Sequence, residues 1–189
     1  MSGAASSVWL VRHGETAWSR DGLHTSTTEV ALTEEGVATA AELGEKLGAK
    51  TFALVLTSPR ERARRTASLA GFPEAVVDDD LAEWSYGSYE GITTPEIRCT
   101  VPGWTVWSHP SPGGETADDV AARVDRVIER ARGAGGDVLL FGHGHALRAL
   151  TARWLGQPVS DGRLYKLATG TVSILGYERE TPVIERWNA

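Results

Sequence analysis

The fold is decided by one stretch near the start of the chain, Val8-Trp9-Leu10-Val11-Arg12-His13-Gly14-Glu15-Thr16. Its first four residues are apolar and show no polar alternation, which is typical of a strand buried on both faces of a sheet. Residues 53–56 and 138–141 form two further runs of the same kind. The sequence therefore predicts three buried strands.

Segments with helical periodicity lie between these runs. Residues 34–47 predict one helix, which Gly48 ends. A longer helix stops at Gly133 and carries an apolar stripe made of Ala117, Val120, Ala121, Val124, Val127, Ile128 and Ala131. Strands that alternate with helices in this way are typical of an α/β fold.

A third helix is expected directly after residues 53–56. Ser58 is a suitable N-cap for it, Pro59 suits the first helical position, and Glu61 completes a capping box with Ser58. We therefore predict that the Ser58 hydroxyl caps this helix.

The last third of the chain contains one more helix and a pair of strands. Leucine and tryptophan recur at helical spacing after residues 138–141, and Gly156 ends the segment. Residues 171–177 and 183–187 are typical of a closing strand pair. Together these elements predict a mainly parallel sheet covered on both faces, as in a three-layer α/β/α sandwich.

The length and composition are those of a single domain spanning residues 1–189, since 41% of the chain is hydrophobic. Residues 93–114 fit no regular period and contain four prolines. We expect this segment to be a cap-like insertion that forms a wall or lid over a pocket.

The charge and the termini bear on partners and location. A net charge of -6 disfavours binding to nucleic acid or to an anionic membrane. No apolar run approaches the roughly 20 residues of a membrane span, and residues 1–4 do not resemble a leader, so we expect a cytoplasmic protein. The single cysteine, Cys99, forms no internal disulfide, and no cluster has zinc-ligand spacing.

Polar residues follow each of the three buried runs. They are Arg12, His13 and Gly14 after the first, residues 58–62 after the second, and residues 142–144 after the third. Parallel sheets of this class bind ligands beyond the carboxyl ends of their strands. If the ends converge, they bring together two imidazoles and two guanidiniums.

That combination points to phosphate chemistry. Arg12 and Arg62 present planar forks that match phosphate oxygens, and glycine lets the backbone approach a ligand closely. His13 is the candidate nucleophile, with His143 among the donors that stabilise the transition state. Taken singly, each residue also has a structural interpretation: a hydrogen-bonded histidine, or a solvated arginine on a helix face.

Five ordered motifs cover nearly the whole chain. They are Arg12-His13-Gly14-Glu15-Thr16, Ser58-Pro59-x-x-Arg62-Ala63-x-x-Thr66-Ala67, Glu83 through Gly87 to Glu90-Gly91, Gly113-Gly114-Glu115, and His143-Gly144. In these motifs the sequence resembles the histidine phosphatase superfamily, the phosphoglycerate mutase-like enzymes. The resemblance implies an α/β/α fold, a phosphorylated His13, and a phosphate pocket without metal or cofactor.

Further pieces are similar to acid phosphatase-like members and to the sedoheptulose-bisphosphatase type. They are Trp18-Ser19-x-x-Gly22-x-His24-Thr25-x-x-Thr28-Glu29 and Gly142-His143-Gly144-His145-Ala146-Leu147-Arg148. The resemblance implies that Glu83 is the acid that protonates the leaving oxygen. It also makes Ser19 and Thr25 candidates for substrate binding, although many relatives have Asn at the Ser19 position. Gly144 and His145 complete the candidate set.

The expected function is therefore a metal-independent phosphatase that hydrolyses phosphate monoesters through a phosphohistidine on His13. Its substrate would be a small phosphorylated metabolite such as a sugar phosphate. A phosphoglycerate mutase-type phosphotransferase is one alternative, although dedicated mutases carry longer cap insertions. A phosphate-binding module without catalysis is another. The sequence leaves the physiological substrate and the oligomeric state open.

Overall fold

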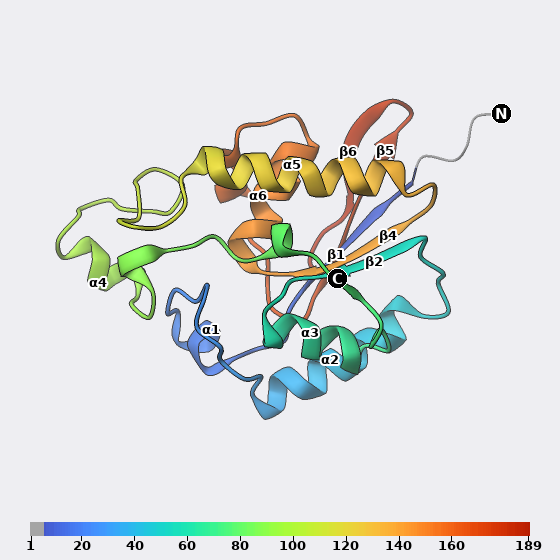
Figure 1. The fold of residues 1–189 in the computed structure, drawn as a ribbon, viewed down its shortest axis with the longest axis horizontal. Helices are drawn as coiled ribbons and strands as arrows, with labels where there is room; N and C mark the ends of the chain where they lie inside the picture. Colours follow the sequence, from blue (N-terminus) through green and yellow to red (C-terminus); the bar gives the residue numbers. More distant parts are fainter. Residues whose placement is uncertain (1–5) are drawn as a thin grey trace.

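The computed structural model describes residues 6–189, which form a three-layer α/β/α sandwich (Figure 1). One six-stranded sheet has the order β3-β2-β4-β1-β5-β6. Its strands are β1 Val8–Arg12, β2 Leu54–Thr57, β3 Val76–Val77, β4 Val138–Gly142, β5 Val172–Glu178 and β6 Thr181–Arg186. The α-helices are α1 Ala17–Asp21, α2 Glu34–Leu47, α3 Glu61–Leu69, α4 Thr94–Arg98, α5 Ala117–Gly133 and α6 Gly144–Trp154. The prediction of fold class is confirmed.

The three buried runs are neighbours in the sheet. β4 lies between β1 and β2 and pairs with both in parallel, with Arg12 opposite Gly142 and Thr57 opposite Phe141. β5 and β6 add the antiparallel edge that the tail predicted. Because β1, β2 and β4 end at the same level, the residues that follow them meet at one edge.

Each face of the sheet has its own apolar core. α2 and α3 cover one face and α5 and α6 the other, as Figure 1 shows. Alternate residues of β1 serve the two cores, because successive strand side chains point to opposite faces: Leu10 packs with the α5 and α6 side, and Val11 with the α2 and α3 side. Burial of each such side chain contributes about 1.5–3 kcal/mol.

The start of α3 differs from the prediction. The helix begins at Glu61 with Arg60 as N-cap, and the Arg60 side chain makes no capping hydrogen bond to the helix backbone. Instead, the Glu29 carboxylate accepts the Glu61 amide hydrogen at 3.1 Å. The predicted capping box is wrong because Ser58 directly follows β2, two residues before the N-cap, and its hydroxyl contacts His143, the residue after β4. A cap supplied from 32 positions away leaves no local signal in the sequence.

The loop that carries His13 is pressed against helix α2. A Cβ added at Gly14 would overlap the carbonyl oxygen of Gly36, and one added at Gly36 would overlap the carbonyl oxygen of Glu15. The Gly14 amide also donates to the Thr66 hydroxyl at 3.0 Å. These contacts fix the backbone after β1 with no room for larger side chains.

Residues 93–114 extend beyond the carboxyl ends of the strands, at the left of Figure 1. The one regular element of this segment is α4, where Thr93 and Glu96 form a capping box. The segment is joined to the residues after α1, since Leu23 bridges Thr93 and the His24 amide donates to the Ile92 carbonyl at 3.0 Å. Residues 93–114, called the excursion below, thus pair with the loop that follows α1 near the start of the chain.

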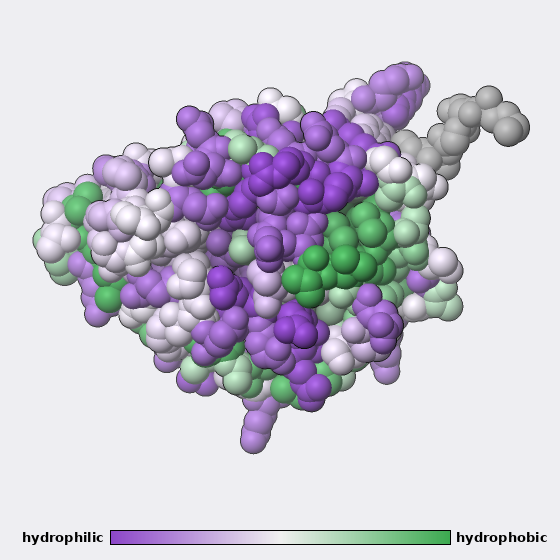
Figure 2. All heavy atoms as spheres, viewed as in Figure 1, coloured by the Kyte–Doolittle hydropathy of each residue, from purple (hydrophilic) through white to green (hydrophobic). Residues whose placement is uncertain are grey.

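Two surface features complete the fold. Asp78 and Asp80 form ion pairs with Arg130, and Asp80 also pairs with Arg126 on α5, so the acidic run joins the edge of the sheet to a helix. Val76 and Val77 of β3 are exposed. Figure 2 shows an apolar patch on an otherwise largely hydrophilic face. No helix in residues 6–189 is both long and apolar enough to cross a membrane. The residues behind the leader prediction, 1–4, lie outside the described part.

Candidate active site

Three strand ends bring the predicted histidines together. The His13 amide donates to the Gly142 carbonyl at 3.0 Å, and the Ser58 amide donates to the Phe141 carbonyl at 2.9 Å. These bonds extend the sheet by one residue beyond β1 and β2. As a result the rings of His13 and His143 lie edge to face, with their centroids 5.1 Å apart.

The imidazole of His13 is held in one tautomer. Its Nδ1 lies 2.7 Å from the Gly14 carbonyl oxygen, which only accepts hydrogen bonds, so Nδ1 carries the proton and Nε2 keeps its lone pair. Burial, together with the charges of Arg12 and Arg62, lowers the pKa of His13 well below its ordinary value. The ring is therefore neutral and nucleophilic at Nε2.

His143 is the most enclosed polar residue of the site. Its side chain is inaccessible to solvent, and its Nε2 lies 2.7 Å from the Ser58 hydroxyl. Its Nδ1 is buried and has no hydrogen-bond partner in residues 6–189. Burial, followed by the positive charge of Arg62, lowers the pKa of His143 well below its usual range.

The two arginines surround this pair. Arg12 donates from Nη1 to the Leu167 carbonyl at 2.6 Å. Arg62 donates from Nη1 to Thr28 and from Nη2 to the carbonyls of Thr25 and Ser26, at 3.0 to 3.2 Å. In both residues Nε is buried and makes no hydrogen bond within the described chain. Each guanidinium thus keeps an unused Nε–H, while Nη1 of Arg12 and both Nη groups of Arg62 hold backbone carbonyls of the surrounding loops.

Glu83 reaches the site through the N-terminus of α6. One carboxylate oxygen accepts the amide hydrogens of Trp84 and Ala146, both at 2.8 Å, and the other accepts that of His145 at 3.0 Å. A helix N-terminus favours negative charge, and these amides fix the orientation of the carboxylate. The negative charge of Glu83 also acts on Arg12, where it opposes the lowering of the guanidinium pKa that burial causes.

These residues border a cavity of about 200 Å³. Of the predicted site residues, the ones that line it are Arg12, His13, Ser19, Thr25, Glu83, Gly144 and His145. Arg62 and His143 are not on its wall and are 1% and 0% exposed. They lie in contact with the lining, since His143 touches His13 and Arg62 holds the carbonyl of Thr25.

The two candidate hydroxyls on the wall are already hydrogen-bonded. Ser19 forms the capping box of α1, where its Oγ accepts the Thr16 amide hydrogen at 2.9 Å and donates to the Thr16 carbonyl at 3.0 Å. Thr25 donates its hydroxyl hydrogen to the Leu23 carbonyl at 3.0 Å. Each oxygen keeps capacity to accept a hydrogen bond from a substrate hydroxyl, whereas neither has a second proton to donate.

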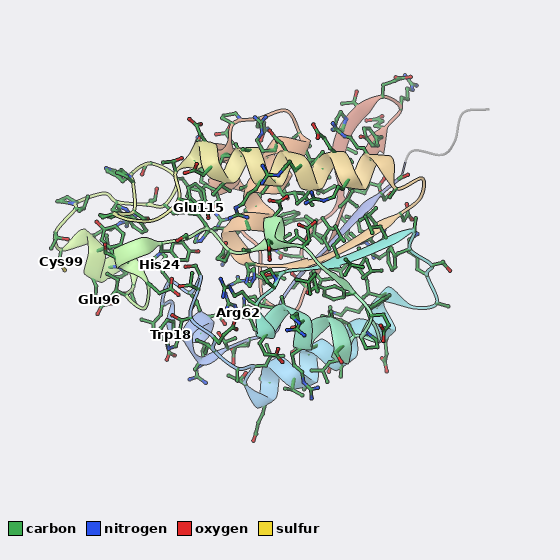
Figure 3. The ribbon with its side chains drawn as sticks, viewed as in Figure 1. Trp18, His24, Arg62, Glu96, Cys99 and Glu115 are labelled. Carbon is green, nitrogen blue, oxygen red and sulfur yellow. The ribbon has the colours of Figure 1, made fainter. Side chains whose placement is uncertain are left out.

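Several wall residues were not predicted as site residues, namely Gly22, Leu23, His24, Tyr86, Thr94, Arg148 and Leu167. Figure 3 shows His24 between Arg62 at the sheet edge and the excursion that carries Glu96 and Cys99. The His24 ring stacks on that of His145 at 6.3 Å. Gly22, His24 and Arg148 stand in the motifs quoted from the sequence, and Arg148 also shares a helix face with His145 three residues before it.

His145 is itself fixed by a neighbour. Tyr86 is buried, and its hydroxyl lies 2.5 Å from His145 Nδ1. Burial, with the charge of Glu83, raises the pKa of Tyr86 well above its usual value, while burial and Arg148 lower the pKa of His145. The phenol therefore donates to Nδ1, and the proton of the neutral His145 sits on Nε2. Metal-ligand clusters of three or more His, Cys, Asp or Glu are absent from residues 6–189.

Comparison with known proteins decides the family. The profile of the histidine phosphatase superfamily (branch 1) matches residues 8–189. The chain belongs to this superfamily. An acid phosphatase of Mycobacterium tuberculosis is 44% identical over a 173-residue alignment, which covers 89% of this chain and 85% of that protein. Sedoheptulose 1,7-bisphosphatase of Saccharomyces cerevisiae is 35% identical over a 180-residue alignment, which covers 78% of this chain and 66% of the yeast protein.

A solved structure extends the likeness to three dimensions. An open reading frame product of Mycobacterium tuberculosis superimposes with a TM-score of 0.93 at 41% identity, covering 97% of each chain. Membership of the superfamily, with relatives named as phosphatases, confirms the resemblance read from the five motifs.

Proposed function

We propose that this protein is a phosphoric monoester hydrolase that transfers the phosphoryl group of its substrate to His13 Nε2 and then to water. The observation that carries the proposal is a set of unpartnered nitrogens on the three residues that neighbour the His13 ring. Arg12 Nε, Arg62 Nε and His143 Nδ1 are all buried without a partner among residues 6–189. Unpaired buried donors are costly, and the equatorial oxygens of a phosphoryl group would satisfy all three at once.

The first half-reaction uses the tautomer that Gly14 imposes. Nε2 of His13 attacks phosphorus, the bond from phosphorus to the ester oxygen breaks, and that oxygen takes a proton as the alcohol departs. Glu83 is the group we assign to this proton, because its carboxylate lines the cavity near Arg12. In the second half-reaction the ionised Glu83 takes a proton from water, which attacks phosphorus and releases His13 and inorganic phosphate.

The substrate class follows from the cavity. A space of about 200 Å³ lined by hydroxyl, imidazole and guanidinium groups suits a small polar phosphate ester, and the named relatives include a sugar bisphosphatase. We therefore propose phosphorylated metabolites such as sugar phosphates. A mutase would use the same residues, and it would return the phosphoryl group to substrate instead of water.

A substrate screen tests the proposal. Purified protein should release inorganic phosphate from p-nitrophenyl phosphate and, with a higher kcat/KM, from one class of phosphorylated metabolite. Acid-quenched enzyme should carry an acid-labile phosphohistidine that the His13→Asn variant lacks. Isomerisation of phosphoglycerate without phosphate release would identify a mutase, and the absence of any turnover would leave a binding module.

We also propose that no metal ion takes part. Arg12, Arg62 and His143 supply the positive charge and donors that a divalent cation provides in other phosphatases. Turnover should persist in EDTA within about twofold. Loss of activity in EDTA that magnesium or zinc restores would show that a ligand set has been missed.

A further inference from the structure

We infer that Ser58 is a positioning residue that fixes the tautomer of His143, so that Nδ1 carries the proton facing the phosphoryl group. The inference rests on the proposed function for its catalytic consequence. The location of the His143 proton does not depend on that function and follows from the hydrogen bonds of the buried Ser58 hydroxyl. This is the same serine that the sequence assigned to a helix cap.

The surroundings of Ser58 direct its hydroxyl hydrogen toward the imidazole. Ser58 is fully buried, and its Oγ accepts the Arg60 amide hydrogen at 3.2 Å. The remaining contact of the hydroxyl is with His143 Nε2 at 2.7 Å. With Arg60 N–H donating to the oxygen, the hydroxyl hydrogen is available for Nε2 and completes the hydrogen bonding of Ser58.

The proton of His143 is then placed by elimination. Its lowered pKa makes the ring neutral, so it carries a single proton. If Nε2 accepts from Ser58, that proton is on Nδ1, the atom left buried and without a partner in the described residues. An N–H at this position donates to a phosphoryl oxygen. The opposite tautomer would present a lone pair to the same oxygen, which is repulsive.

The two histidines of the site are therefore neutral in opposite roles. The Gly14 carbonyl accepts from Nδ1 of His13 and frees a lone pair for attack. The Ser58 hydroxyl donates to Nε2 of His143 and leaves an N–H for stabilisation. A carbonyl and a hydroxyl thus assign nucleophile and donor to two rings 5.1 Å apart.

The expected effect follows from the strength of one hydrogen bond. A net contribution of about 1 kcal/mol corresponds to roughly a fivefold tautomer preference, and a bond in a buried site is worth more. Complete loss of a charge-stabilising donor lowers kcat by roughly 10²- to 10³-fold. Ser58→Ala should therefore lower kcat by roughly fivefold or more, and by less than complete loss of the donor would, with little change in KM.

The test uses 15N-labelled histidine in the full chain, with the His143 signals assigned from their absence in His143→Asn. In the wild type, Nε2 of His143 should show the shift of an unprotonated ring nitrogen and Nδ1 that of a protonated one. Ser58→Ala should mix or invert the two, and Ser58→Thr, which keeps the hydroxyl, should restore them. Thr57→Val is the matched control, because it removes a buried hydroxyl one residue away that contacts only the Ser58 carbonyl, at 3.3 Å.

The outcomes separate this inference from the proposed function. A wild-type His143 protonated on Nε2, or an unchanged tautomer in Ser58→Ala, would overturn the inference whatever the activity. A wild type with the expected tautomer and no phosphatase activity would instead contradict the proposed function. If Ser58→Thr does not fold, Ser58→Ala against Thr57→Val still decides, and a kcat loss of equal size in both would also overturn the inference.

Discussion

Two parts of the cavity are built in different ways. The floor consists of Arg12 and His13 on the cavity wall, with Arg62 and His143 buried in contact with that wall. Arg12, His13 and His143 lie at or directly after the ends of neighbouring strands, and Arg62 is the second residue of α3. The rim consists of Ser19, His24, Thr25, Thr94, His145 and Arg148, which come from helix α1, the loop after it, the excursion and the first turns of α6. The floor is held by the sheet, and the rim by contacts between segments far apart in the sequence.

The difference shows how this fold separates chemistry from recognition. Every floor residue is fixed by backbone carbonyls, a buried hydroxyl or the sheet itself, so the floor presents the same donors to any phosphoryl group. Rim residues surround the part of the substrate beyond phosphorus. If this separation is correct, floor variants lose turnover for every substrate, and rim variants change which substrate is preferred.

The largest expected effect is that of His13→Asn. The amide nitrogen of asparagine can replace the donor to the Gly14 carbonyl, but Nε2 and with it the nucleophile are lost. We expect kcat to fall by at least about 10⁴-fold for every phosphate ester. Turnover and acid-labile phosphoenzyme should be measured together.

The control for this variant is His109→Asn, because His109 is exposed on the excursion and should leave turnover unchanged. Phosphoenzyme that persists in His13→Asn would place the nucleophile elsewhere and remove the basis for the floor as defined.

Glu83→Gln tests the boundary between floor and rim. Its side chain keeps one oxygen, which can still accept the amide hydrogens of Trp84 and Ala146, while its NH2 group replaces the oxygen that accepts from the His145 amide. The variant side chain cannot transfer a proton. General acid catalysis contributes roughly 10²- to 10⁴-fold, so sugar phosphates should lose about that much. p-Nitrophenyl phosphate should lose less, because its phenolate departs with little help from a proton.

The comparison of the two leaving groups decides the role of Glu83. Equal losses for both substrates would exclude it as the acid and would leave it as a group that orients the N-terminus of α6. If Glu83→Gln slows phosphoryl transfer from sugar phosphates to His13 but leaves hydrolysis of the phosphohistidine unchanged, Glu83 acts in the acid step alone.

The buried histidines of floor and rim also make stability depend on pH. The pKa values of His13, His143 and His145 are all lowered in the folded protein, chiefly by burial. The pKa of histidine in the unfolded chain is about 6.5, so below that pH the unfolded chain binds protons that the folded chain does not. The free energy of unfolding therefore has its full value above about pH 6.5 and decreases as the pH drops. Each neutral histidine contributes a slope of up to about 1.4 kcal/mol per pH unit.

Denaturant unfolding between pH 7 and 5 measures this slope. His13→Asn should reduce it by up to about 1.4 kcal/mol per pH unit, and His109→Asn should leave it as it is. A flat profile would mean that the buried imidazoles take up protons in the folded state. The same shift implies that His13 remains an active nucleophile well into mildly acidic solution.

The floor could be predicted from sequence, and much of the rim could not. His13 and His143 follow apolar runs, and a parallel sheet brings such ends together, so strand pattern alone placed them correctly. His24 and Thr94 meet only because the segment after α1 pairs with the start of the excursion, a contact 70 residues apart that no periodicity encodes. Ser58 was misread for a related reason: a serine before a helix has the same local pattern whether it caps that helix or binds an imidazole 85 residues away.

The smallest expected effect tests the rim at its most ordered point. Tyr86 holds His145 by a single hydrogen bond, and His145 presents Nε2–H on the cavity wall. Tyr86→Phe removes that bond while keeping the ring that packs against His24 at 4.8 Å. A hydrogen bond of about 1 kcal/mol net corresponds to roughly fivefold, so kcat/KM for the preferred metabolite should fall by about that factor. p-Nitrophenyl phosphate has no hydroxyls to meet Nε2–H, and its kcat/KM should change less than about twofold. His145→Asn should reproduce this pattern, since both variants act on the same donor. Losses beyond about hundredfold on both substrates would instead show that His145 acts on the phosphoryl group, and the boundary between floor and rim would then have to include the second residue of α6.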